Sequence, residues 1–267
     1  MQQTLEQWVE MLLAAPLPVL ERTVAELARL RENEDRISAR HISSVVLHDP
    51  IMTVKVLRYL QQHRSKRQSA DITTIDRALM MLGLSPFFEH FGVQDTIEAR
   101  LSNVPEALHG ARKVARRAHL AALYAYDWAQ LRHDIDPEEI MVAALLHDLA
   151  EIVLWCFAPE LALRIEELQK QDRMLRSVTA QTEVLGFPLI ELQLAMAKAW
   201  QLPGLLHLLT DDRHVNSPRV LNVVQATAIA RHSARGWSNP ALPDDYAAVG
   251  RLLGLARNDV AQRVMDI

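Results

Sequence analysis

Apolar residues recur every three to four positions along almost the whole chain, and no segment shows a sustained alternation of apolar and polar residues. A period near 3.6 is typical of amphipathic helices, whereas a half-buried strand repeats every two residues. The pattern therefore predicts an all-α protein. We expect helices near residues 4–14, 19–31, 38–48, 50–62, 74–83, 86–92, 106–132, 137–156, 159–171, 177–185, 189–200, 204–210, 218–235, 245–253 and 259–265.

Several predicted helix starts carry proline directly after a residue type that caps helices, at Asp49-Pro50, Ser85-Pro86, Asp136-Pro137 and Ser217-Pro218. The side chain at an N-cap accepts hydrogen bonds from free backbone N–H groups, and proline at the next position loses no bond. Each dipeptide is therefore predicted to begin a helix. Glu139 stands three residues after Asp136, which also predicts a capping box there.

Two breaks organise the chain. A polar and basic stretch from His63 to Asp71 is expected to form an exposed loop, and a second break falls at Ser102-Asn103-Val104-Pro105. With 267 residues and 49% hydrophobic content, the chain can bury a large core. We expect a multi-helical bundle in two packed halves, residues 1–104 and 105–267, either as separable domains or as one continuous domain.

Composition limits the classes of function. The net charge of -4 gives no overall attraction to nucleic acid or to an acidic membrane. The single cysteine, Cys156, excludes an internal disulfide, and its apolar neighbours predict a buried structural thiol. The amino terminus carries Glu6 and Glu10 and no basic segment of a signal peptide, and we expect no apolar run to approach the ~20 residues that span a bilayer. The sequence thus predicts a cytoplasmic protein without membrane contact.

The very apolar predicted helix over residues 137–156 carries the pair His147-Asp148, whose imidazole and carboxylate could ligate a divalent metal. The dipeptide is not specific by itself, because it also occurs at His48-Asp49 and His133-Asp134. Adjacent helical residues point about 100° apart, so a metal site needs further ligands from other helices. His119 is the candidate third ligand. The alternative is a structural pair whose polar groups bond to neighbouring helices.

Short segments spread over most of the chain share their pattern with one known family. They are Leu17-Pro18, the stretch from Ile42 to Asp49-Pro50, the stretch from Ile72 to Gly83, Ala144-Leu145-Leu146-His147-Asp148, Glu183-Val184-Leu185-Gly186 and Trp200-Gln201-Leu202-Pro203. Over roughly residues 14–235 the chain resembles the HDOD family, bacterial signalling domains related to HD-type metal phosphohydrolases. The resemblance implies an HD-like helical bundle and a role in bacterial signal transduction.

The chain departs from active HD enzymes at positions that the resemblance associates with metal binding and catalysis. Glu151 stands where these enzymes have a lysine, which reverses the local charge. The segment from Thr210 to His214 stands where many relatives have a His-His pair, and Ala226-Thr227-Ala228 has no carboxylate where a late metal-binding aspartate is expected. Either His119 or the neighbouring Ala118 matches the first metal histidine. The resemblance therefore implies a degenerate metal site.

Two basic clusters are candidate anion sites. In the stretch Arg112-Lys113-Val114-Ala115-Arg116-Arg117 the four cations follow one helix face, while Val114, Ala115 and Ala118 are predicted to face inward. The second cluster, Arg64, Lys66 and Arg67, falls in the predicted loop. Together the clusters could bind a cyclic dinucleotide or an RNA backbone. The alternative is a solvated helix face and an ordinary polar loop.

Three functions remain open. The first is a non-catalytic signalling or scaffold protein that meets regulatory protein partners in trans, with no catalytic residue, cofactor or metal; the sequence contains no phosphate loop, CxxC pair or nucleophile elbow. The second is a phosphohydrolase acting on nucleotides or cyclic dinucleotides, with a divalent metal at His147, Asp148 and His119. The third is an anion- or nucleotide-binding regulator that uses the basic clusters. No oligomeric state is predicted.

Overall fold

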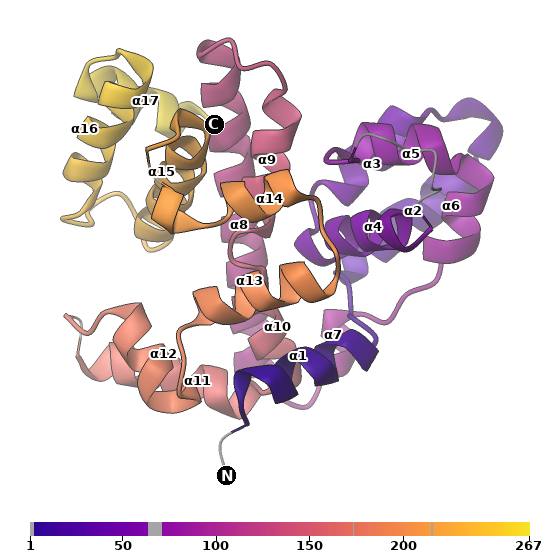
Figure 1. Cartoon of the computed structure of the whole chain (residues 1–267), viewed down its shortest axis with the longest axis horizontal. Helices are drawn as coiled ribbons and strands as arrows, with labels where there is room; N and C mark the ends of the chain where they lie inside the picture. Colours follow the sequence, from indigo (N-terminus) through magenta and orange to yellow (C-terminus); the bar gives the residue numbers. More distant parts are fainter. Residues whose placement is uncertain (1–2, 64–70, 173, 215) are drawn as a thin grey trace. The chain divides into compact units, whose positions relative to one another are not determined.

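The protein is described here by a computed structural model that covers residues 3–63, 71–172, 174–214 and 216–267 (Figure 1). Within these ranges the regular elements are helices, and the remaining β pairing is one isolated parallel bridge between Val19 and Thr96. The prediction of an all-α protein is confirmed.

The helices form two compact units. The first comprises Met1–Ala115 with Asp148–Leu202, and the second Arg116–His147 with Pro203–Ile267. Both units are therefore discontinuous in sequence, whereas the predicted halves 1–104 and 105–267 are continuous. The predicted division at residue 104, as separable domains or as one continuous domain, stays a prediction.

The first unit holds most of the amino-terminal helices and returns after Asp148 with four more. Its elements are α1 (Leu5–Ala14), α2 (Glu21–Arg31), the 3-10 helix η1 (Glu34–Arg36), α3 (Ala39–Val46), α4 (Pro50–Gln62), α5 (Ile75–Leu82), α6 (Leu84–Phe91), α7 (Ile97–Arg100), α10 (Leu149–Phe157), α11 (Pro159–Gln171), α12 (Ser177–Leu185) and α13 (Leu189–Ala199). The long helix α8 (Pro105–Leu131) begins in this unit and ends in the second.

Helix α10 is the most apolar element of the first unit, and it packs against α11 and α13. A helix that is apolar nearly all round has to be buried, which explains its central place. Helix α1, whose Trp8 and Leu12 are buried, packs on α13. Gly110 of α8 lies so close to the ring of Trp155 in α10 that a Cβ atom there would come within 2.6 Å of it.

The second unit is built around α15. Its elements are the end of α8, α9 (Pro137–Leu146), α14 (Gly204–Leu209), the 3-10 helix η2 (Asp212–His214), α15 (Pro218–Ser233), α16 (Leu242–Leu253) and α17 (Arg257–Asp266). Helix α15 packs on α9, α14 and α16, and α16 packs on α17, as their neighbouring ribbons show in Figure 1. The buried Asn222 of α15 donates from Nδ2 to the carbonyl oxygen of Ala125 in α8 (3.2 Å).

The predicted helix starts are confirmed at three of the four proline dipeptides, where α4, α9 and α15 begin with proline. Asp49 caps α4 with its side chain, whereas Asp136 is the N-cap of α9 by backbone conformation and makes no side-chain cap bond, so the capping box was wrong. The start at Ser85-Pro86 was also wrong. Helix α6 begins at Leu84, directly after Gly83, whose φ of +84° suits glycine.

The stretch predicted as one helix over 137–156 is interrupted at His147-Asp148, which separates α9 from α10. The expectation that no apolar run approaches the length of a membrane span was also wrong. Pro137–Phe157 is a 21-residue helical stretch that is long and apolar enough by composition, but 83% of its most apolar window is buried inside the protein. That burial is the mark of a core helix.

Candidate functional site

His147, the first residue of the candidate metal pair, stands at the carboxyl end of α9 and is buried. Its Nε2 atom lies 2.8 Å from Oδ1 of Asp212, a residue of η2 in the same unit whose side chain is 49% exposed. Because a carboxylate only accepts hydrogen bonds, Nε2 carries the hydrogen in this contact. The imidazole nitrogen that faces Asp212 therefore has no lone pair for a metal.

Asp148, the second residue of the pair, is buried at the N-cap position of α10. Its backbone carbonyl oxygen accepts from the N–H groups of Glu151 and Ile152, at 3.1 and 3.3 Å. The side chain makes no cap bond to the first turn of α10. A backbone N–H group of that turn, that of Ala150, instead donates a hydrogen bond to Oε1 of Gln193 in α13 at 2.8 Å. The break at the pair is thus supported by a tertiary hydrogen bond.

The third candidate ligand, His119, is a half-buried residue of α8. A zinc or other hydrolytic metal site needs three or more protein ligands. Across the part of the chain that the structure describes, no group of three or more histidine, cysteine, aspartate or glutamate side chains is arranged to hold a metal ion. The donor set around His147 therefore does not fit the metal that the family resemblance implies.

The first basic cluster lies on α8, with Arg112 and Arg116 exposed and Lys113 and Arg117 half-buried. Two of these cations face carboxylates: Arg112 Nε lies 3.0 Å from Oε1 of Glu98, and Lys113 Nζ lies 3.9 Å from Oε1 of Glu166. Such pairs reduce the positive field that an anion would meet. The prediction that Val114, Ala115 and Ala118 face inward is confirmed, because all three are buried.

The second basic cluster, Arg64, Lys66 and Arg67, lies outside the described residues. Anion binding by either cluster stays a prediction.

The sequence pattern does not indicate Asp212 as a partner of His147. A signal for its position was present, because Asp212 lies in the segment that stands where many relatives have a His-His pair. Its neighbour Asp211 is buried and binds Arg213, with Oδ1 2.8 Å from Nε and Oδ2 2.6 Å from Nη2. These bonds lower the pKa of Asp211 below its usual value. Two carboxylates therefore anchor the segment between α14 and α15. Asp212 bonds to His147, and Asp211 bonds to Arg213.

The helical fold and the His147-Asp148 pair match the pattern of an HDOD-type helical protein, and the comparison with known families agrees. The HDOD domain model matches residues 17–215. The chain belongs to the HDOD domain family. No curated protein matches it.

Solved structures share the fold at low sequence identity. The MmoQ response regulator from Methylococcus capsulatus str. Bath is 19% identical over 94% of this chain and 99% of that chain, with a TM-score of 0.72. A virulence factor from Campylobacter jejuni is 18% identical over 98% of this chain and 97% of its own, with a TM-score of 0.66. An HDOD domain protein of unknown function from Geobacter sulfurreducens is 16% identical over 97% and 92%, with a TM-score of 0.50. At these identities the likeness shows the fold alone.

Proposed function

We propose that this HDOD protein is a non-catalytic signalling or scaffold protein, acting in bacterial regulation through contacts with regulatory proteins in trans. The observation that carries the proposal is the hydrogen bond between Nε2 of His147 and Oδ1 of Asp212. In a metal-dependent HD enzyme this histidine would turn a lone pair toward a metal. Here Nε2 ties the end of α9 to η2, which is a structural role for that nitrogen.

Two further features support a regulatory rather than a hydrolytic role. The described residues offer no set of three ligands for a metal, so they provide no centre that would activate water. Glu151, half-buried in α10, places a negative charge where active relatives have a lysine, and it would repel a phosphate ester. The structural likeness to a response regulator is compatible with signalling and carries no more than the fold.

The first experiment measures metal content and hydrolysis together. Untagged protein purified without chelators is measured by elemental mass spectrometry for iron, manganese, nickel and zinc, and assayed on a chromogenic phosphodiester and on cyclic dinucleotides. The matched variant is His147→Ala. We expect no stoichiometric metal, and any trace activity should be the same in both proteins. Stoichiometric metal that His147→Ala removes, together with activity, would establish the hydrolase and overturn the proposal.

The second experiment tests the regulatory half of the proposal in the organism that encodes the chain. A deletion strain is complemented with the wild type or with His147→Ala at matched protein levels. If the protein acts as a scaffold, we expect both proteins to reverse the phenotype of the deletion strain, because partner contacts do not need metal chemistry. Failure of a stably folded His147→Ala protein, with the wild type succeeding, would favour the enzyme.

A further inference from the structure

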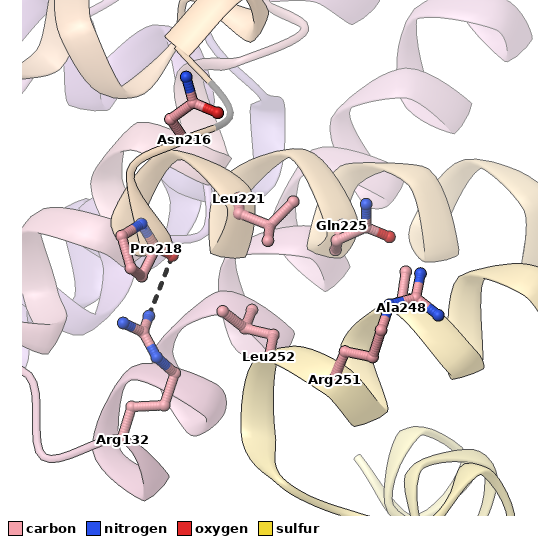
Figure 2. Close-up of a pocket in the computed structure, with 8 residues that line it drawn as sticks. All are labelled: Arg132, Asn216, Pro218, Leu221, Gln225, Ala248, Arg251 and Leu252. Atoms are coloured by element: carbon pink, nitrogen blue, oxygen red, sulfur yellow. Dashed lines mark hydrogen bonds between the residues drawn. The ribbon is translucent and has the colours of Figure 1, made fainter.

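A pocket of about 440 Å³ opens in the second unit between the end of α8, the first half of α15 and the second half of α16 (Figure 2). Ligand pockets in proteins have volumes of roughly 300–1,000 Å³, so this one has room for a small molecule. Arg132 is the lining residue that falls inside the HDOD match at 17–215, and the other lining residues follow it. Neither His147 nor Asp148 lines the pocket, so the pocket is separate from the candidate metal pair.

The lining combines two cations with an apolar surface. Figure 2 shows Arg132 beside Pro218 at one end and Arg251 beside Gln225 at the other, with Leu221 and Leu252 between them. No carboxylate is among the described residues that line the pocket. The positive charge of the two guanidinium groups is thus not neutralised by the lining, which favours a ligand with a negative charge and an apolar body.

The two arginines differ in how they are held. Arg132 Nη1 donates to the carbonyl oxygen of Pro218 at 3.0 Å, which fixes its guanidinium group at the start of α15. Arg251 is exposed on α16. A guanidinium group presents several N–H donors in one plane, which matches the two oxygens of a carboxylate. Arg251 is therefore the better candidate for the direct partner of an anionic head group.

Hydrogen bonds outside the pocket connect the helices that form it, α8, α15 and α16. Nδ1 of His232 in α15 lies 2.5 Å from Oδ2 of Asp245 in α16. Asn239, in the connection between these helices, donates from Nδ2 to the carbonyl oxygen of His232 at 3.0 Å. The bond from Asn222 to Ala125 joins α15 to α8. A pocket whose walls are fixed in advance loses little conformational entropy when it binds a ligand.

From this arrangement we propose that the pocket binds a small organic anion with an apolar chain, such as a medium-chain carboxylate. The head group pairs with Arg251 beside Gln225, and the chain lies on Leu221 and Leu252 toward Arg132. This inference does not rest on the proposed signalling function, because the pocket shares no residue with the His147-Asp148 pair.

The test titrates the full-length protein with three probes that share one chain: octanoate, octyl phosphate and octanol. Binding is followed by isothermal calorimetry and by NMR shifts in α15 and α16. We expect saturable binding of octanoate or octyl phosphate, with octanol much weaker; the stronger of the two anions identifies the head group. Equal binding of octanol, or no saturable binding of either anion, overturns the proposal.

Two variants make the test specific. Arg251→Gln is expected to weaken the anion about tenfold or more, because a hydrogen bond to a charged group is lost. Arg257→Gln, at an exposed arginine of α17 outside the pocket lining, is the matched control and should bind as the wild type does. Thermal melts check that both variants fold. Unchanged affinity in a folded Arg251→Gln protein contradicts the assigned contact and overturns the proposal.

Discussion

At the scale of single residues, Cys156 shows how burial controls chemistry. The thiol is 3% exposed in α10, and desolvation raises its pKa to about 12. Since the thiolate is the reactive form, we expect no labelling of the native protein by a thiol reagent at pH 8 and one label per chain after denaturation. Mass spectrometry after a timed reaction measures this. Ser102→Cys, at an exposed position, should label rapidly in the native state; rapid labelling of Cys156 itself would contradict the buried environment.

Asp49 is a buried carboxylate that joins two segments of the first unit, the starts of α2 and α4. Its Oδ2 accepts from the N–H of Leu20 (2.7 Å) and the hydroxyl of Thr23 (2.8 Å), and its Oδ1 caps α4 through the N–H groups of Ile51 (2.9 Å) and Met52 (3.1 Å). Burial raises the pKa of Asp49, and these bonds oppose that rise.

Removing the Asp49 carboxylate would leave buried donors without their acceptor, which is costly. We expect Asp49→Ala to lower the free energy of unfolding by about 3 kcal/mol in urea denaturation. Thr4→Ala removes an exposed capping box from α1 and should cost only about 1 kcal/mol. Equal losses in the two variants would show that the tertiary bonds of Asp49 contribute little.

Asp211 makes a pH-dependent contribution to the free energy of unfolding, and the sign of that contribution follows from its bonds to Arg213. The bonds to Arg213 lower its pKa in the folded protein below the ordinary value of 3.8. A lowered folded-state pKa means that the ionised form stabilises the fold at pH above 3.8, and that this contribution is lost as the pH falls through the folded-state pKa.

We therefore expect Asp211→Asn to lower the melting temperature slightly at pH 7, with the difference from the wild type shrinking in acid below about pH 4. Thermal melts across this range measure the effect. Asp244→Asn, at an exposed site in the first turn of α16, serves as the control. A difference that stays constant down to strong acid would rule out ionisation as the cause.

At the scale of elements, the contact between α8 and α10 decides whether a glycine-to-alanine substitution in α8 stabilises or destabilises the protein. Alanine in place of a mid-helix glycine normally stabilises a helix by about 1 kcal/mol. At Gly110 the new Cβ would lie 2.6 Å from the Trp155 ring, and overpacking of this kind costs roughly 1–3 kcal/mol.

We expect Gly110→Ala to be destabilising overall in urea denaturation. Gly204→Ala is the matched control, because a Cβ built there at the start of α14 has no atom within 4 Å apart from its chain neighbours and its own helix backbone. The control should be neutral or slightly stabilising. A Gly110→Ala protein as stable as the control would mean that α8 and α10 separate easily.

Most helices could be predicted because each buries one apolar face, and periodicity records that face along the sequence. The break between α9 and α10 could not be predicted, because the stretch from Met141 to Leu154 is apolar on both sides of His147-Asp148. What supports the break is the side chain of Gln193, which accepts from Ala150 across 43 residues of sequence. A local pattern contains no information about a bond of that range.

At the scale of the whole molecule, the candidate site was also predictable only where its residues are close together in the sequence. The family resemblance located His147-Asp148 and the lost lysine position at Glu151, because those residues are adjacent in sequence. The partner Asp212 lies 65 residues from His147, so only the folded chain brings it to the Nε2 atom. The pocket between α15 and α16 was also unseen, since its cations are spread from Arg132 to Arg251.

The division of the chain at residue 104 can be tested directly by making the two halves. A fragment of residues 1–104 keeps α1, with its buried Trp8 and Leu12, but loses α13, the helix on which α1 packs. It also loses the bond from Arg100 Nε to the carbonyl oxygen of Cys156 (2.7 Å). Apolar burial contributes about 25 cal/mol per Å², so exposing two large side chains of α1 removes several kcal/mol from a fold that is only marginally stable.

We therefore expect fragment 1–104 not to melt cooperatively by circular dichroism, whereas the full chain and fragment 105–267, which contains all of the second unit, should. The matched control is the full chain cleaved at a protease site inserted at residue 104, in which every contact of the first unit is still available. If the cleaved protein stays folded while fragment 1–104 alone does not, the first unit needs both parts of the sequence. Two fragments that each unfold cooperatively would instead identify the predicted halves as independent domains.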